Sequence, residues 1–322
     1  MLRLGTVPIL WNNDDLPDLR GGSVYPFEEV LAAIAAAGFA GTELGSNHPR
    51  EAIALGRELA RRNLRLSGAY WCPGLTDPDR AEAALDDVEP LLALLEAVGC
   101  EYLIAAEPLS TVRGAFVGRA AQAPSLADAG WRCLAAALDE LGWRCRGRGI
   151  RLAFHNHAGT WVETPDEVAR LLGMTDPERV GLCLDTGHWT VGGGDAPNGV
   201  RDWLPRLRYL HVKDVAPAVL AALRDEGFDF HEALRRRIFT ELGKGCVDLP
   251  AIAATLAEAG WSGWVVAEQD TSWLEPGEAA AHNFATLHAL TRGQQAPGTN
   301  GVSPAQAPGS AGVSPAPRGL AP

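Results

Sequence analysis

Four apolar runs of this chain each stop at a histidine or a carboxylate, and this recurrence constrains the fold more than any other feature. The runs, each given with the residue that follows it, are 150–154 with His155, 180–184 with Asp185, 207–210 with His211 and 263–267 with Glu268. Short apolar runs of this kind are typical of buried strands. An ionised group at the end of a buried strand is costly unless an opposite charge meets it. We therefore expect the four strand ends to share one polar site.

Strand and helix patterns alternate over residues 1–292, which favours a (β/α)8 TIM barrel, a fold whose active sites form at the carboxyl ends of the strands. The expected strands are 2–10, 41–44, 64–70, 100–106, 150–155, 180–184, 207–212 and 263–267. The expected helices are 26–38, 50–62, 79–98 with a break at Pro90, 125–146, one that Thr164 caps, 199–204, 249–259 and 276–292. The alternative is an open doubly wound sheet, but no GxGxxG turn follows the first strand.

The composition changes after the last expected helix. Residues 293–322 consist largely of Pro, Gly, Ala and Ser, and the pentamer Gly-Val-Ser-Pro-Ala occurs at 301–305 and again at 312–316. A segment of this kind cannot bury enough apolar surface to fold. We expect a disordered tail without a catalytic role.

Charge and cysteine usage exclude several classes of protein. The net charge of −12 and the pI of about 5.1 argue against a nucleic-acid-binding protein, which needs a basic face. The six cysteines include no CxxC pair, so neither a zinc ribbon nor a thioredoxin motif is indicated. The sequence shows neither a signal peptide nor an apolar run long enough to cross a membrane. We expect a cytoplasmic protein that does not bind membranes.

The four strand ends predict a metal site. Asp185, His211 and Glu268 are the expected ligands, because each follows the apolar run of its strand directly. For the fourth ligand we favour Glu163, with His155 as the alternative. Mixed carboxylate and imidazole ligands suit Mn²⁺, Co²⁺, Fe²⁺ or Zn²⁺ better than Ca²⁺. The competing interpretation is a network of buried salt bridges.

Further candidates surround this site. The candidate catalytic residues are Lys213, His157 and Glu43, and the candidate substrate-binding residues are Trp11, Asn13, Asp14, His155 and His188. Lys213 lies two residues beyond His211, so strand alternation directs both side chains to the same side. A divalent cation nearby would lower the pKa of Lys213, which could then act as an acid or a base. The aromatic, amide and carboxylate groups of residues 11–15 suit a polyhydroxylated ring.

These motifs resemble the xylose-isomerase-like barrel superfamily of sugar isomerases and epimerases and, within it, the inosose dehydratase family. The matching segments span nearly the whole barrel and are 8–15, 41–45, 155–164, 184–188, 211–215, 243–248 and 267–270. Many members carry Glu at the position of His155. The resemblance implies Mn²⁺ or Co²⁺ as cofactor and, as is sometimes given for the dehydratase, glutathione. No other feature of the sequence indicates glutathione.

The expected function is that of a metal-dependent dehydratase. Such an enzyme would remove water from a cyclic keto-polyol, for example scyllo-inosose in inositol catabolism, through a metal-bound enediolate. A sugar or sugar-phosphate isomerase or epimerase is the alternative, because it shares the first proton abstraction. A non-catalytic sugar-binding barrel and an endonuclease-like member are disfavoured by the ligand pattern and the acidic charge. The expected partner is a small polyol or sugar, and assembly into a homo-oligomer is left open.

Overall fold

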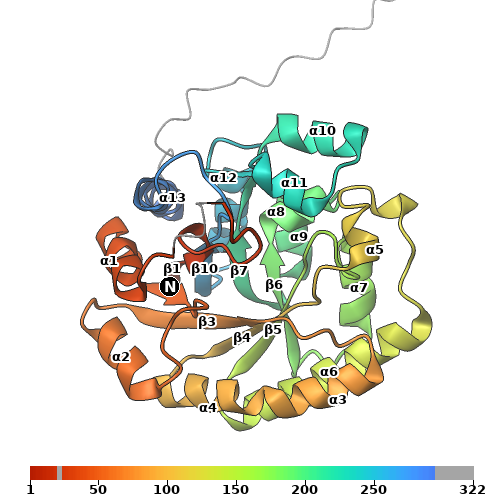
Figure 1. Cartoon of the computed structure of the whole chain (residues 1–322), viewed down its shortest axis with the longest axis horizontal. Helices are drawn as coiled ribbons and strands as arrows, with labels where there is room; N and C mark the ends of the chain where they lie inside the picture. Colours follow the sequence, from red (N-terminus) through yellow and green to blue (C-terminus); the bar gives the residue numbers. More distant parts are fainter. Residues whose placement is uncertain (20–23, 294–322) are drawn as a thin grey trace, which may run out of the picture.

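Eight parallel strands close into a barrel in the computed structural model, which describes residues 1–19 and 24–293 (Figure 1). The strand order is β1-β10-β7-β6-β5-β4-β3-β2, and the barrel closes because β1 pairs with both β2 and β10. The strands are β1 (Leu2–Thr6), β2 (Gly41–Glu43), β3 (Arg65–Trp71), β4 (Tyr102–Ala105), β5 (Arg151–His155), β6 (Val180–Asp185), β7 (Leu207–Val212) and β10 (Gly263–Ala267). The predicted TIM barrel is confirmed, whereas the predicted tail lies outside the described residues except for Gly293.

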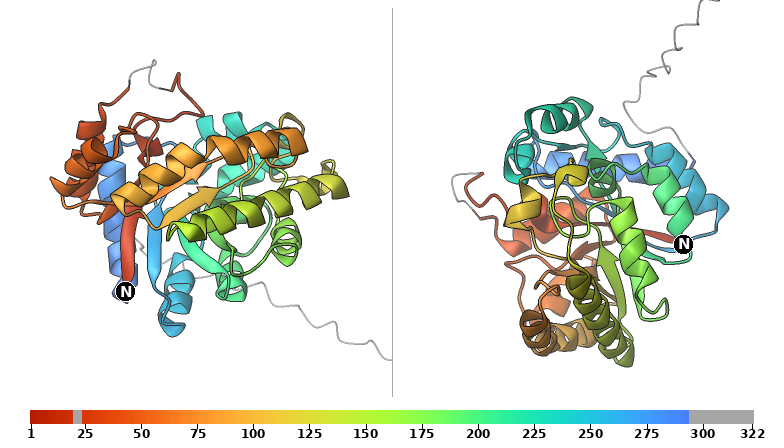
Figure 2. Two further views of the ribbon diagram at one scale, coloured as in Figure 1. Left: turned by 90° about the horizontal axis from the view of Figure 1, so that it is seen from below. Right: turned by 90° about the vertical axis from the view of Figure 1, so that its right-hand side faces the viewer.

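Helices surround the barrel, as the two further views in Figure 2 show. The helices between consecutive barrel strands are α1 (Phe27–Ala37), α2 (Ala52–Ala60), α3 (Pro78–Asp87), α4 (Glu89–Val98), α6 (Asp128–Gly147), α7 (Pro165–Gly173), α9 (Ala196–Trp203) and α12 (Leu249–Glu258), and α13 (Pro276–Thr291) follows the last strand. Shorter elements extend the loops, namely η1 (Pro8–Leu10), α5 (Thr111–Gly114), η2 (Ala120–Gln122), α8 (Thr186–Val191), β8 (Asp214–Val215), α10 (Pro217–Glu226), α11 (Phe230–Arg235) and β9 (Phe239–Thr240). Most of these shorter elements were not expected from the sequence.

Local sequence explains where several helices begin and end. The expected break at Pro90 is present, since α3 ends at Asp87 and α4 begins at Glu89 with Pro90 in its first turn, where a missing N–H is tolerated. Thr164 caps α7 in a capping box with Glu167, as the sequence predicts. Gly38 ends α1 with a φ of 106°, a backbone conformation that favours glycine.

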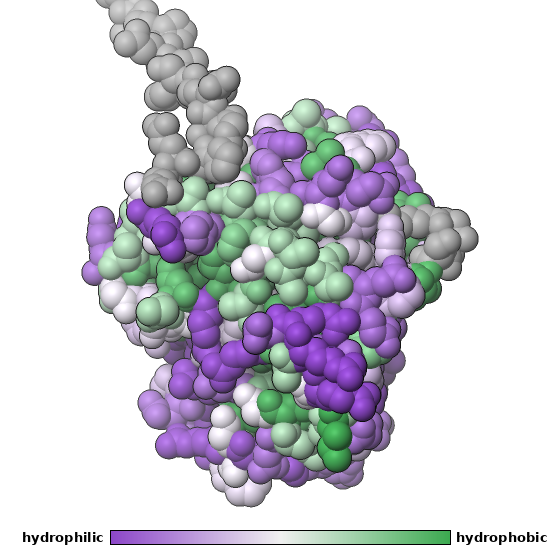
Figure 3. All heavy atoms as spheres, turned by 90° about the vertical axis from the view of Figure 1, so that its left-hand side faces the viewer, coloured by the Kyte–Doolittle hydropathy of each residue, from purple (hydrophilic) through white to green (hydrophobic). Residues whose placement is uncertain are grey.

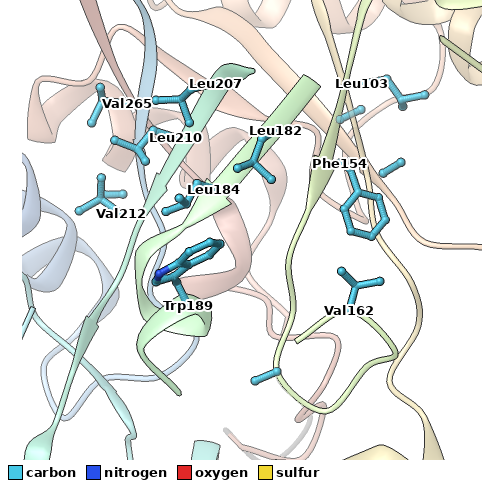
Figure 4. Close-up of a cluster of buried hydrophobic side chains, with 14 of the residues drawn as sticks. Leu103, Phe154, Val162, Leu182, Leu184, Trp189, Leu207, Leu210, Val212 and Val265 are labelled. Atoms are coloured by element: carbon cyan, nitrogen blue, oxygen red, sulfur yellow. The ribbon is translucent and has the colours of Figure 1, made fainter. Parts of the chain in front are cut away.

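Strand alternation divides the core into two parts. One part packs between the strands and the helices, and Figure 4 shows Leu103, Phe154 and Leu182 among its side chains. The other part fills the barrel and contains Tyr102, Ile104, Ala153, Cys183, Tyr209, Trp264 and Val266. His155, Asp185, His211 and Glu268 each lie two residues beyond one of these inner residues, so they continue the inner face of their strands. The fold therefore directs all four towards the barrel axis.

The outer face over α1 and α13 has little charge. Helix α1 buries Val30, Leu31 and Ile34, while Ala32 and Ala36 are exposed on its other side. Figure 3 shows a weakly hydrophobic band across this face, bordered by hydrophilic residues. Among the described residues, no helix is long and apolar enough to span a membrane.

Candidate metal centre and catalytic cavity

Four side chains meet at the carboxyl ends of adjacent strands. His155 of β5, Asp185 of β6, His211 of β7 and Glu268 directly after β10 each offer one ligand atom, and these atoms lie within 4.8 Å of one another. All except the partly buried Glu268 are completely buried. Three of the four are the ligands predicted first from the sequence. Their role as ligands remains a prediction, but the structure brings them together.

The hydrogen bonding of this group fits a divalent cation. Oδ2 of Asp185 and both ring nitrogens of His155 are buried without a hydrogen-bond partner. Buried polar atoms without a partner are rare and costly. Nδ1 of His211 lies 2.5 Å from Oε2 of Glu268 and 3.8 Å from Oδ2 of Asp185, so the three atoms surround one point. Imidazole and carboxylate ligands suit Mn²⁺, Fe²⁺, Co²⁺ or Zn²⁺.

Neighbouring groups hold two of these ligands in place. Nε2 of His211 lies 2.6 Å from Oε1 of Glu43, and a proton donated there leaves Nδ1 free to bind a metal. Oδ1 of Asp185 accepts a hydrogen bond from the backbone N–H of His188 at 2.8 Å, which leaves Oδ2 for the ion. Glu43 was predicted as a catalytic residue, and the structure places it behind a ligand, where it also lines the cavity.

Glu163, the residue favoured as fourth ligand, lies outside this group. Its carboxylate is fully buried and accepts hydrogen bonds from the backbone N–H groups of Gly118 and Gly159, each at 2.9 Å. The guanidinium of Arg113 lies 3.8 Å away and balances its charge. Glu163 thus ties the loop after β4 to the loop after β5, and His155 occupies the position in the metal group.

Lys213 is directed inward beside the metal group, as alternation predicts. Its Nζ lies 3.0 Å from Oε1 of Glu268, 3.0 Å from Oδ2 of Asp270 and 3.9 Å from Oδ2 of Asp185. Burial opposes the charge, but Asp270 and Glu268 more than compensate, so these carboxylates by themselves raise the pKa of Lys213. Lys213 is therefore a buried cation beside the metal group, and the lowering of its pKa by a bound metal ion stays a prediction.

His157 and His188 form a stacked pair with ring centroids 3.8 Å apart. Nδ1 of His188 accepts a hydrogen bond from the N–H of Ala158 at 3.1 Å, and its Nε2 lies 3.0 Å from Nζ of Lys213. Burial lowers the pKa of His188 and, aided by His155 and Lys213, lowers that of His157 to about 3. Both rings are therefore neutral. His157 lines the cavity, whereas the predicted substrate contact of His188 is replaced by contacts within the protein.

The loop after β1 is arranged differently from the prediction. Trp11 is buried in the hydrophobic core and provides no platform for substrate. Asn13 closes its own loop, because its amide donates to the backbone oxygen of Asp270 at 2.7 Å and its side-chain oxygen accepts from the N–H groups of Asp15 and Leu16. Asp14 does line the cavity, together with Asp15.

A cavity of about 780 Å³ opens above the metal group and includes His211 and Glu268 in its lining. Asp270 and Tyr70 also line it, although neither was predicted as a site residue. Asp270 could have been found by alternation, since it lies two residues beyond Glu268. Burial and the nearby Glu268 raise its pKa to about 7, against the opposing effect of Lys213. The Tyr70 ring stands edge-on to His155 at 5.7 Å between centroids.

Comparisons with known proteins identify the family of the chain. Residues 31–290 match the model of the xylose isomerase-like TIM barrel family. The inosose dehydratase of Bacillus velezensis is 35% identical over 278 residues, which cover 86% of this chain and 92% of that protein. The rhizopine catabolism protein MocC of Rhizobium meliloti is 37% identical over 277 residues, which cover 85% of this chain and 84% of that protein. The crystal structure of the IolI protein with a bound zinc atom superposes with a TM-score of 0.67 at 15% identity, covering 90% of this chain and 98% of that one. The chain belongs to the xylose isomerase-like TIM barrel family.

Proposed function

We propose that this chain is a metal-dependent dehydratase, a carbon–oxygen lyase that removes water from a cyclic keto-polyol such as scyllo-inosose in inositol catabolism. The observation that carries the proposal is the group of ligand atoms on four adjacent strand ends, of which those of His155 and Asp185 have no hydrogen-bond partner, with a buried lysine beside them. A protein named inosose dehydratase aligns with 86% of the chain, which supports this substrate class over others of the family. The proposal places the reaction in the cytoplasm.

His155, Asp185, His211 and Glu268 would hold the metal, and Mn²⁺ or Co²⁺ is the proposed ion. When bound, such an ion supplies Lewis acidity to a substrate carbonyl and to an adjacent hydroxyl oxygen. Glu43 keeps the His211 ring in the required orientation. Glutathione remains a prediction from the resemblance alone.

The remaining steps belong to His157, which lines the cavity, and to the buried Lys213 beside the metal group. His157 is neutral, and Nδ1 lies 2.8 Å from the backbone oxygen of Ala158, so a proton held there leaves Nε2 to accept the proton next to the carbonyl. Lys213, fixed by Glu268 and Asp270, stabilises negative charge that develops on a substrate oxygen. Its ammonium would also donate a hydrogen bond to the departing hydroxyl group. An isomerase would use the same first proton transfer, so the position of this donor separates the two reactions.

The test uses the full chain loaded with Mn²⁺ and incubated with scyllo-inosose. A dehydratase gives a product that has lost one water by mass spectrometry, while an isomerase or epimerase gives a product of unchanged mass. The metal-free protein and the Asp185→Asn variant serve as controls and should be inactive. Product of unchanged mass would replace the proposal by the isomerase alternative, and absence of any product would reject both for this substrate.

A further inference from the structure

The cavity extends well beyond the metal group. Its volume of about 780 Å³ lies in the range of pockets that enclose drug-sized ligands, roughly 300–1,000 Å³, and exceeds the needs of a single polyol ring. The lining therefore has to be divided into the part that a polyol ring would occupy and the part that it would leave empty.

Two chemically different ends make up this lining. The end at the metal group is polar and contains Glu43, His157, His211, Glu268 and Asp270. The other end is largely apolar and contains Trp71, Leu91, Leu94, Pro108 and Leu109, with Glu107, the residue before Pro108, as a carboxyl group in its lining. Trp71 ends β3, which lies opposite β7 and His211 in the closed strand order. The apolar end thus lies across the barrel mouth from His211.

The apolar end is formed by three separate segments. Leu91 and Leu94 are one turn apart on α4, so they present one continuous surface. Trp71 contributes from β3, and Pro108 and Leu109 from the loop after β4. Leu94 is buried, while Leu91 and Trp71 remain partly exposed, so apolar surface is available to a ligand. Exposed Arg50 and Asp87 also line the cavity and give this end a polar rim.

We propose that this apolar end is a second subsite, which accepts a hydrophobic alkyl or aryl substituent carried by the cyclic polyol. This inference rests on the proposed function, which places the polyol ring at the metal group. Hydroxyl groups placed against the leucines would lose their hydrogen bonds to water without replacement, which disfavours a second polyol there. Because both ends belong to one cavity, a single molecule can fill both. The substrate class is then an O-substituted cyclic keto-polyol, such as an alkyl or aryl ether.

The test compares the binding of scyllo-inosose, its mono-O-benzyl ether and benzyl alcohol to the Mn²⁺-loaded protein by calorimetry. The ether should bind at least about tenfold more tightly than scyllo-inosose, because the benzyl group buries apolar surface. In Leu91→Trp the new ring fills the subsite, so ether and parent should bind with equal affinity. Leu91→Asn keeps the size of the side chain and should reduce the gain if Leu91→Trp fails to fold. Ala93→Trp places the same ring on an exposed position of α4 outside the cavity, and it should retain the gain.

The outcomes separate this inference from the proposed function. Equal affinity of ether and parent for the unaltered protein overturns the subsite, and so does a gain that Leu91→Trp leaves intact. If scyllo-inosose and its ether both bind, with equal affinity, and benzyl alcohol binds as well, the cavity holds a site for a separate apolar molecule, which also overturns the proposal. If scyllo-inosose and its ether both fail to bind, the proposed function fails. In that case, benzyl alcohol binding that Leu91→Trp abolishes would still support an apolar subsite.

Discussion

Asp185 and Asp214 are both fully buried aspartates at strand ends, yet their surroundings differ in one respect. The two oxygens of Asp214 accept four hydrogen bonds from the backbone N–H groups of Gly243, Gly245, Val215 and Val247. Asp185 accepts one from His188, and its Oδ2 has no hydrogen-bond partner. The chain itself satisfies Asp214 and thereby fastens the loop after β9, whereas Oδ2 of Asp185 is left for the proposed metal ion. Buried carboxylates near strand ends therefore serve either the loops or the proposed chemistry.

The largest expected effect comes from Asp185→Asn. Loss of the negative charge removes a metal ligand while leaving the size of the side chain unchanged. Changing a group that only supports a metal ligand costs about 10–100-fold, so loss of the ligand should cost more than about 1,000-fold in turnover. Metal content by atomic emission and turnover of scyllo-inosose are measured on the same sample. Full metal content and full rate in this variant would show that Asp185 is not a ligand and has a structural role, as Asp214 does.

Lys213→Met should come next, because it removes the fixed cation but none of the four ligand atoms. General acid–base groups contribute about 10²–10⁴-fold to rate, and we expect a loss in this range with metal retained. Turnover and metal content together decide the result. Near-normal turnover would reduce Lys213 to a counter-ion for Glu268 and Asp270.

Glu43→Gln should have a smaller effect. The amide can still contact Nε2 of His211 but no longer carries the charge that holds the ring as a ligand. A loss of about 10–100-fold in metal affinity is expected, and excess Mn²⁺ should restore most of the turnover. If activity is lost while metal affinity is normal, Glu43 acts on the substrate directly, as the sequence predicted.

Asp214→Asn should leave the metal content unchanged and lower stability instead. One oxygen becomes an NH₂ group that faces backbone donors, so buried N–H groups lose their acceptor. A loss of about 2–3 kcal/mol in the free energy of unfolding is expected from urea denaturation. Glu163→Gln is the parallel variant for the loops after β4 and β5. Metal loss in either variant, with the fold intact, would erase the distinction between the two kinds of carboxylate.

Glu107 has fewer hydrogen bonds from the backbone than Asp214, and its substitution should give the smallest effect of the series. It is buried, and Oε1 accepts a single backbone hydrogen bond, from Leu75 at 2.6 Å. Burial raises its pKa to about 7 from 4.5, against the opposing effect of that bond. The folded state thus holds the proton more tightly than the unfolded chain, so its contribution to stability is present below pH 4.5 and is lost as pH rises through 7. Glu107→Gln should become more stable than the unaltered protein, on the order of 2 kcal/mol, as pH rises over this interval. A stability difference independent of pH would show that Glu107 ionises normally.

The sequence predicts those parts of the molecule that follow strand alternation. Tyr209, His211 and Lys213 are each two residues apart, so strand alternation directs all three side chains inward. The metal group and the lysine could therefore be anticipated together. Glu163 could not be placed in this way. It lies in a loop, where side chains do not alternate between two faces. Its partners are the backbone N–H groups of Gly118 and Gly159, and backbone groups cannot be recognised from the types of the residues.

Loop conformation also explains the other differences. Trp11 follows the expected strand 2–10 and precedes several polar residues, yet β1 ends at Thr6 and the turn of η1 directs Trp11 into the core. Asn13 was expected to contact substrate, but its amide donates to the backbone oxygen of Asp270, far away in the sequence. Both outcomes depend on packing against residues far away in the sequence, which local patterns do not encode.

Closure of the barrel has a consequence for synthesis of the chain. The last strand, β10, is paired with β1 and β7, and Glu268 directly follows β10. A growing polypeptide therefore presents His155, Asp185 and His211 before their fourth companion exists. At about 5–20 residues per second this interval lasts seconds. During this time β1 lacks one of its two partner strands, and the group of four side chains lacks Glu268. A chain released before β10 is synthesised therefore lacks both the closed barrel and the complete group.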